Sequence, residues 1–346
     1  MHSHDLGPPE TWHVALTGDP MSIESIAEAI RSYPGVTRKH AIHKIVDLLP
    51  TAAFPQVVAA EGEDAAAIDV GDQYVLFAAD GIMESLVNTN PYYAGYFAVL
   101  VNVNDIAAMG GRPLGMVDVM SIVHGEVCRE IIRGMKDGIR KFNVPIVGGH
   151  VHPDCHYNAI DISIVGRVAK DALLRSSTAE PGDDIVFVID TDGFYPDDLP
   201  YAFVTTIDKS DEIVRDQMEA VAVVGERHLA HSCKDMSNPG SIGTLGMMLE
   251  SSSVGALVDI TAIPRPEGAD EVKWYLTYQG CGFCFACPPE NSQAIIDIFS
   301  EVGCEGAVVG KVDDSKQLKI TDGSETTVLF DFEKDIITGC RPKERD

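Results

Sequence analysis

The residues best suited to chemistry in this sequence are aspartates that stand where a strand or a helix is expected to end and small residues follow. They occur in three segments of the first half of the chain: Glu63-Asp64-Ala65-Ala66, Ala79-Asp80-Gly81 and Asn104-Asp105-Ile106-Ala107. Carboxylates at such ends, beside glycines that let a ligand approach the backbone, suit a site that holds a phosphate through Mg²⁺. The pattern predicts an enzyme that uses a nucleotide.

Each of these aspartates by itself is also what an ordinary turn or cap contains. Asp105 carries more information, because it falls near the last turn of a helix expected from about Tyr92 to Met109. Negative charge at that end opposes the helix dipole, so the carboxylate is better explained if it faces a cation. Taken together, Asp64, Asp80 and Asp105 favour a metal–phosphate site.

The familiar nucleotide-binding motifs are absent from the sequence, which has no GxxxxGK[ST], no GxGxxG after a strand and no kinase catalytic set. Two other segments are candidates for phosphate contact. One is the cationic cluster Thr37-Arg38-Lys39-His40, for which an ordinary solvated turn is an equally good explanation. The other is Gly148-Gly149-His150, where His150 follows two glycines and is well placed to contact a phosphate or the substrate.

Two other metal sites are disfavoured. The segment from His150 to His156 contains His, Cys and Asp, the usual zinc ligands, but its spacing is crowded and no distant partner pair is evident. The run Cys281-Gly282-Phe283-Cys284-Phe285-Ala286-Cys287 resembles an iron–sulfur or zinc motif. As a strand it puts Cys281 and Cys287 on one face and Cys284 on the other, so we expect buried, reduced thiols.

Helical and strand patterns alternate along the chain and predict an α/β (α+β) protein with mixed sheets rather than a helical bundle. Ser22 is expected to cap a first helix with Ile23 and Ile30 on its buried face. Pro181-Gly182-Asp183-Asp184 opens a new apolar strand, so we place a domain boundary near residue 170. The predicted parts are a flexible arm over residues 1–20, a first domain over 21–170 and a second domain over 171–346.

Composition limits the possible partners. With 346 residues, 45% of them hydrophobic, the chain can bury more than one core. Its 26 Lys and Arg against 53 Asp and Glu give a net charge of −27, which repels nucleic acid and means that a bound phosphate needs a cation to screen it. No stretch is apolar enough to span a bilayer and no signal peptide is evident, so we expect a cytoplasmic protein without a membrane partner.

The order of the aspartate segments, followed by Gly110-Gly111-Arg112-Pro113 and Gly148-Gly149-His150, resembles the PurM-like superfamily of ATP-binding proteins. This superfamily includes AIR synthase, selenophosphate synthetase, thiamine monophosphate kinase and HypE. Lys234-Asp235-Met236-Ser237 resembles the aspartate-bearing loop of the family. The Gly-Gly-His ending is similar to the selenophosphate synthetase-related branch, and the C-terminal half to uncharacterised relatives such as the archaeal methanogenesis marker protein 2 group.

The resemblance implies a two-domain PurM-like fold, in which the N-terminal mixed sheet joins that of a second subunit in a barrel-like homodimer. A C-terminal α/β domain would close over a cleft that binds ATP and Mg²⁺. Matched to the family's motifs, the metal ligands would be Asp64, Asp80, Asp105 and Asp235. The nucleotide would be bound by Asp64, Asn104, Gly148 and Gly149. The catalytic residues would be Lys39, His150 and Arg112.

The sequence also departs from the characterised relatives. Selenophosphate synthetases use a Cys or selenocysteine in an N-terminal segment, whereas this chain has no cysteine before Cys128. HypE ends in a reactive cysteine, whereas Cys340 is followed by Arg341 to Asp346. We therefore expect an ATP- and Mg²⁺-dependent enzyme that activates an O, S or Se atom of a small substrate by phosphoryl transfer. The alternative is a dimeric ATP-binding sensor or assembly protein with no chemistry of its own.

Overall fold

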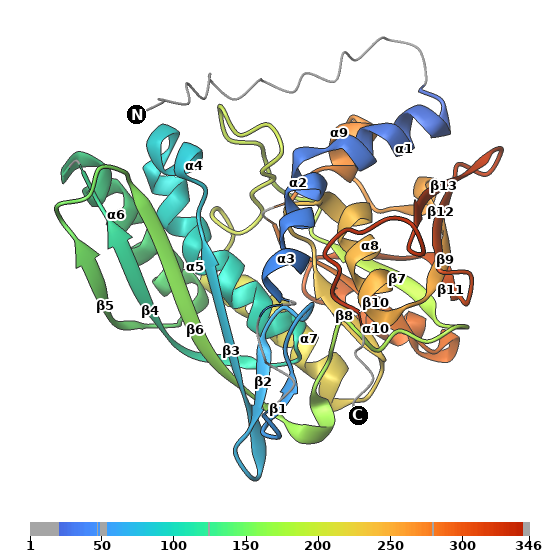
Figure 1. The fold of residues 1–346 in the computed structure, drawn as a ribbon, viewed down its shortest axis with the longest axis horizontal. Helices are drawn as coiled ribbons and strands as arrows, with labels where there is room; N and C mark the ends of the chain where they lie inside the picture. The colour runs from blue at the N-terminus through green and yellow to red at the C-terminus, as the bar shows by residue number, and fades with distance from the viewer. Residues whose placement is uncertain (1–20, 47, 49–53, 124, 279, 342–346) are drawn as a thin grey trace.

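The computed structural model describes residues 21–46, 48, 54–123, 125–278 and 280–341. The arm predicted over residues 1–20 lies outside this range. Within it, the chain forms two mixed sheets with helices packed against both (Figure 1), so the predicted α/β class is confirmed. No helix in the described part of the chain is long and apolar enough to cross a membrane.

The first sheet has six strands in the order β1-β2-β3-β6-β4-β5. Their bounds are β1 Val57–Ala59, β2 Ala66–Asp69, β3 Gln73–Gly81, β4 Arg112–Ser121, β5 Ile146–His152 and β6 Ala159–Ala169. Strands β4 and β5 are parallel, and the other neighbours are antiparallel. The helices of this half are α4 Glu84–Thr89, α5 Pro91–Ala108 and α6 Gly125–Phe142.

Helix α5 is the central element of the molecule. Its 18 residues are mostly apolar all the way round the helix and most are buried, as expected for a helix enclosed by protein on all sides. One side packs on the first sheet and on α6, and another meets the second half of the chain. A Cβ at Gly95 of α5 would lie 2.0 Å from the carbonyl oxygen of Ile131 in α6, so only glycine allows this close helix contact.

The second sheet has seven strands in the order β13-β12-β9-β11-β7-β10-β8. Their bounds are β7 Asp184–Ile189, β8 Ser232–Asp235, β9 Gly255–Asp259, β10 Gly282–Cys287, β11 Glu305–Asp313, β12 Gln317–Thr321 and β13 Thr326–Asp331. The helices are α7 Asp211–Glu226, α8 Gly240–Ser252, α9 Glu271–Tyr275 and α10 Ser292–Ser300. Short 3₁₀ turns are η3 Lys170–Ala172, η4 Ile260–Ala262 and η5 Pro289–Asn291.

The cysteine-rich segment forms strand β10 and the residue before it, as predicted. Its two faces enter different cores: Cys281 and Cys287 join the core on one side of the second sheet, and Cys284 joins the core on the other. Each of the three thiols has a different nearest sulfur or oxygen atom. For Cys281 Sγ this atom is Cys304 Sγ, at 3.9 Å. The prediction of a buried strand with its cysteines on two faces is therefore confirmed.

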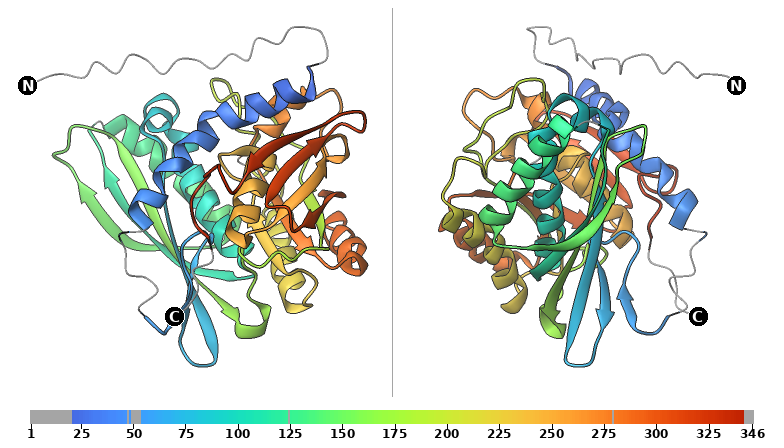
Figure 2. Two further views of the ribbon diagram at one scale, coloured as in Figure 1. Left: turned by 45° about the vertical axis from the view of Figure 1, so that its right-hand side comes forward. Right: turned by 90° about the vertical axis from the view of Figure 1, so that its left-hand side faces the viewer.

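The N-terminal helices connect the two halves. They are α1 Ile23–Ser32, α2 Pro34–Thr37, η1 Arg38–Ala41 and α3 His43–Val46. The predicted cap of α1 is confirmed, because Ser22 Oγ accepts a hydrogen bond from the Ser25 amide at 3.2 Å. However, α1 packs beside β13 with the core of the second sheet (Figure 2), and Arg31 donates to the Val328 carbonyl at 3.0 Å. A domain boundary near residue 170 therefore groups α1 with the first sheet by sequence, although α1 packs against the second sheet.

Candidate functional site

A cleft of about 1150 Å³ is lined by residues from both halves of the chain. Its walls come from η1, the end of β3, α5, the loop after β8 and the segment 195–202. All four aspartates expected to hold metal line it, as do Lys39 and Asn104. The cleft is larger than the usual small-molecule pocket of about 300–1,000 Å³, so it has room for a nucleotide and a second small molecule.

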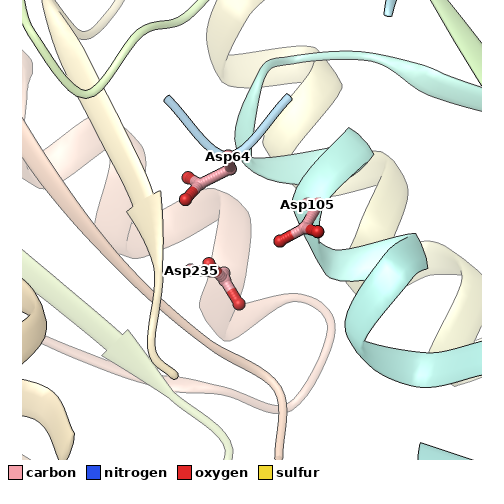
Figure 3. A group of neighbouring side chains, drawn as sticks. All are labelled: Asp64, Asp105 and Asp235. Carbon is pink, nitrogen blue, oxygen red and sulfur yellow. The ribbon is translucent and has the colours of Figure 1, made fainter. Parts of the chain in front are cut away.

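Four carboxylates from distant segments share one end of this cleft. Asp64 lies in the turn before β2, Asp105 in the last turn of α5, and Asp235 at the end of β8. Figure 3 shows these three side chains gathered from separate elements, and one oxygen of each lies within 4.8 Å of the others. Asp80, the residue before the end of β3, lines the same cleft. We call these four residues the carboxylate cluster.

The ionised form of the carboxylate cluster is unfavourable in the metal-free protein. Burial raises the pKa of Asp105 well above its usual range, and the charges of Asp80 and Asp235 raise it further. Burial, and next the charge of Asp64, raise the pKa of Asp235 to about 7. Burial also raises the pKa of Asp80, although Lys39 opposes the rise. A divalent cation among these oxygens would favour the ionised carboxylates and so oppose both causes of the shift.

A lysine ammonium already lies within the cluster. The buried Lys234 Nζ pairs with Asp64 Oδ1, whereas Asp64 Oδ2 is buried without a hydrogen-bond partner. Burial alone would lower the pKa of Lys234, but the charges of Asp64 and Asp235 outweigh it and raise the pKa. Lys39 lines the same cleft, and burial lowers its pKa, as does the charge of Lys234. Two amino groups thus face four carboxyl groups at this end of the cleft.

The donor set of the cluster fits Mg²⁺. This ion prefers carboxylate and water oxygens to nitrogen or sulfur, and the cluster offers carboxylate oxygens, one of which is the unpartnered Asp64 Oδ2. Asp64, Asp105 and Asp235 are placed to hold such an ion. No second group of three His, Cys, Asp or Glu side chains converges in this way within the described residues.

The structure corrects the expectation for Arg112. This residue begins β4 and points away from the cleft, where its guanidinium pairs with Glu226 at 2.6 Å and with Glu219 on α7. These contacts fasten the first sheet to a helix of the second half of the chain. The sequence places Arg112 just after Asp105, but Gly110 and Gly111 turn the chain, so that the two side chains diverge.

Gly148, Gly149 and His150 are also outside the cleft of their own chain. They belong to β5, the edge strand farthest from β1 in the first sheet, and all three are exposed. Among the described residues, the His150 ring packs against one other aromatic ring. This is the ring of His152 on the same strand, with centroids 4.6 Å apart. The order of strands in the sheet puts β5 at this edge, and strand order cannot be read from the Gly-Gly-His pattern itself.

Sequence reasoning missed one wall of the cleft, which is formed by Thr338 and Cys340 near the C-terminal end. The fully buried Glu250 of α8 holds this segment. Its carboxylate accepts hydrogen bonds from the amides of Ile337 at 3.1 Å and Thr338 at 2.7 Å, and from the amide of Gly339 at 3.2 Å. No sequence signal joins a glutamate in a helix to a loop almost ninety residues later.

Comparison with known proteins agrees with this architecture. Residues 62–168 match the family described as AIR synthase related protein, N-terminal domain, and residues 195–323 match AIR synthase related protein, C-terminal domain. The two mixed sheets and the cleft between them thus define a two-domain protein of the PurM-like fold. The chain belongs to the AIR synthase related family.

Individual relatives differ in what is known of them. An uncharacterized protein of Methanocaldococcus jannaschii is 45% identical over 327 residues, which are 92% of this chain and 100% of that protein. The selenide, water dikinase of Aeromonas hydrophila is 25% identical over 234 residues, 63% of this chain and 64% of that enzyme. The structure of T. maritima PurL complexed with ATP has a TM-score of 0.74 at 19% identity, covering 94% of this chain and 53% of that one. This chain thus spans about half the length of PurL, and the likeness shows the fold.

Proposed function

We propose that the protein is an ATP- and Mg²⁺-dependent enzyme that transfers a phosphoryl group to an oxygen, sulfur or selenium atom of a small molecule. The observation that carries the proposal is the meeting of Asp64, Asp105 and Asp235 in a cleft between the two halves of the chain. The relatives support it, because one is a selenide, water dikinase and another, PurL, is solved with ATP.

The residues of the chain would act mainly through position and charge, which supply most of the catalysis in phosphoryl transfer. Asp64, Asp105 and Asp235 would hold Mg²⁺, and the bound ion would offset the negative charge of the polyphosphate. Lys39, which lines the same cleft, would place its ammonium on the terminal phosphate. The lowered pKa of Lys39 reflects burial, so its charge would act with little screening by water.

The proposal is tested by calorimetric titration of ATP with and without Mg²⁺, and by ADP assays with a panel of acceptors. We expect binding that needs Mg²⁺, and Asp80→Ala should weaken it at least tenfold because a carboxylate of the cluster is lost. Asp314→Ala, at an exposed aspartate outside the cleft, should leave binding unchanged. Absence of binding at millimolar ATP would refute the proposal. Tight binding without ADP formation from any acceptor would favour the non-catalytic sensor.

We also propose that the protein is a homodimer joined through the open face of the first sheet. Helices α5 and α6 cover one face of this sheet. On the other face, apolar side chains of β3, β4 and β5 are between 41% and 72% exposed: Phe77, Val117, Val119 and Val147. Exposed apolar side chains gathered on one face of a sheet are typical of a protein interface.

Val147→Asp is expected to convert the dimer to monomers, because Val147 is 72% exposed in one chain and a charge buried at an interface is strongly unfavourable. Light scattering after size-exclusion chromatography measures the mass. Val308→Asp, at a 41% exposed valine of β11 in the second sheet, is the matched control and should stay dimeric. A wild-type protein that is monomeric, or a Val147→Asp variant that is dimeric, would show that this face is not the interface.

A further inference from the structure

The part of the cleft formed by the second half of the chain differs in chemistry from the carboxylate cluster. Tyr195, Tyr201 and Tyr278 line it, and we call these three residues the tyrosine wall. The Tyr201 ring packs edge-on against buried Tyr33 with centroids 5.2 Å apart, and Tyr195 Oη hydrogen-bonds to Thr277 Oγ1 at 2.9 Å. These contacts fix the rings of Tyr195 and Tyr201, so this part of the wall is preorganised for a flat ligand.

Two cations flank the tyrosine wall. Lys273 Nζ lies 3.6 Å from the centroid of the Tyr195 ring, and both Lys273 and Arg38 line the cleft. Arg38 is close enough to Tyr278 to act on it: burial raises the pKa of Tyr278, and the charge of Arg38 opposes that rise. The guanidinium of Arg38 contacts the sulfur of Met83 at 2.7 Å.

Neither cation has a carboxylate partner within 4.0 Å in the described part of the chain, although acidic residues outnumber basic ones by 53 to 26. Asp198 lines the same cleft, and Asp270, which caps α9, lies near the wall, but neither forms an ion pair with Lys273 or Arg38. A cation–π contact leaves an ammonium free to bind an anion on its open side. The charges therefore point to an anionic ligand from outside the chain.

The tyrosine wall lies next to the carboxylate cluster. Tyr278 lines a small side cavity together with Met236, and Met236 directly follows Asp235. Both residues also line the main cleft. A ligand on the wall would thus be adjacent to a nucleotide phosphate held at Asp235, and the cleft volume of about 1150 Å³ allows both to be bound together.

From these contacts we infer that the tyrosine wall, with Lys273 and Arg38, binds the phosphoryl acceptor, and that the acceptor is a small molecule with a flat, unsaturated body and an anionic group, a carboxylate or a phosphate. The body packs against Tyr201 and Tyr278, because Lys273 covers the ring of Tyr195, and the anion meets the two cations. This inference rests on the proposed function, because it needs a phosphoryl donor at the carboxylate cluster.

The adenine ring of the nucleotide is the other flat group that the wall would accept. Adenine is neutral, and its binding there would leave Lys273 and Arg38 without counter-charges. The two assignments differ in what Lys273 does, because in one it determines the affinity for the acceptor and in the other it contributes to the affinity for the nucleotide.

Calorimetry with four probes tests the inference, using protein with Mg²⁺ and a non-hydrolysable ATP analogue present. Benzoate and phenyl phosphate carry an anion on a flat ring, benzyl alcohol is neutral and benzylamine is a cation. We expect at least one anionic probe to bind tenfold or more tighter than benzyl alcohol, and benzylamine to bind no tighter than benzyl alcohol. The stronger of benzoate and phenyl phosphate identifies the anionic group.

Lys273→Met should lower the affinity for the anionic probe at least tenfold and leave the affinity for the ATP analogue within twofold, whereas Lys273→Arg should restore most of the loss. Lys136→Met, at an exposed lysine of α6 outside the cleft, is the matched control and should bind as the wild type does. Thermal unfolding of each variant verifies that it is folded.

Equal affinity for all four probes, with the ATP analogue bound, would overturn this inference and leave the proposed function intact. The same holds if Lys273→Met weakens the ATP analogue and not the anionic probe, because the wall would then belong to the nucleotide. Failure of the ATP analogue to bind, by contrast, would refute the proposed function, whatever the aromatic probes do.

Discussion

Replacing Asp235 by asparagine is expected to stabilise the metal-free protein against unfolding and to abolish Mg²⁺-dependent turnover. Burial and the charge of Asp64 raise the pKa of Asp235 to about 7 in the folded protein, against about 3.9 in an unfolded chain. Between these two values the folded protein holds a proton that the unfolded chain has released. The free energy of unfolding therefore falls as the pH rises through this window, and the variant lacks that penalty.

Thermal unfolding of the metal-free proteins at pH 5 and pH 8 measures the effect. The variant should be more stable than the wild type by about 1–3 kcal/mol at pH 8, and by less at pH 5. Mg²⁺ should raise the melting temperature of the wild type alone, and ADP formation by the variant should fall by about 100-fold or more. Asp314→Asn should behave as the wild type does. A variant that is less stable at pH 8 would contradict the argument.

Replacing Lys234 by methionine is expected to have the opposite effect on stability. The change leaves Asp64 buried without its counter-charge, and removes the ammonium that offsets Asp235 and Asp105. Removing one partner of a buried ion pair destabilises a protein by about 3–5 kcal/mol. Mg²⁺ should restore part of this loss, because the ion supplies the missing positive charge at the same oxygens.

Chemical denaturation with and without Mg²⁺ measures both effects, and the chain offers a matched control. Lys170 pairs with Asp69 at 2.6 Å, but both side chains are more than 30% exposed, so Lys170→Met should cost about 1 kcal/mol or less. A double variant with Lys234→Met and Asp64→Asn should recover part of the stability that the single change loses. Equal losses for the two lysine variants would mean that Lys234 does not neutralise the cluster.

Three members of the carboxylate cluster, Asp64, Asp80 and Asp105, were accessible from the sequence because their signals are local, whereas Asp235 came from the family resemblance. Asp105 is unfavourable at the C-terminal end of a helix whatever the fold, and the alternation of Cys281, Cys284 and Cys287 between two faces follows from strand geometry alone. Each of these predictions needs only the conformation of a few neighbouring residues. The class of fold follows in the same way from the alternation of elements.

The positions of Arg112, His150 and α1 in the structure depend on long-range information. Arg112 and His150 follow the aspartate segments in sequence, but the order of strands in the first sheet directs one toward α7 and puts the other on the edge strand β5. Helix α1 precedes the first sheet and yet packs on the second. The tyrosine wall was missed because its residues are spread over more than eighty positions and no short motif joins them.

The carboxylate of Glu250 limits how the C-terminal end of the chain can be truncated or labelled. Helix α8 begins five residues after Asp235 and runs 13 residues, about 20 Å, to the turn where Glu250 holds residues 337–339. One helix therefore connects the loop after Asp235 at one end to residues 337–339 at the other. Thr338 and Cys340 are part of the cleft rather than an appendage. Truncation before residue 337 would remove one wall of the site. A label attached just after residue 337 would report, through α8, on events at Asp235.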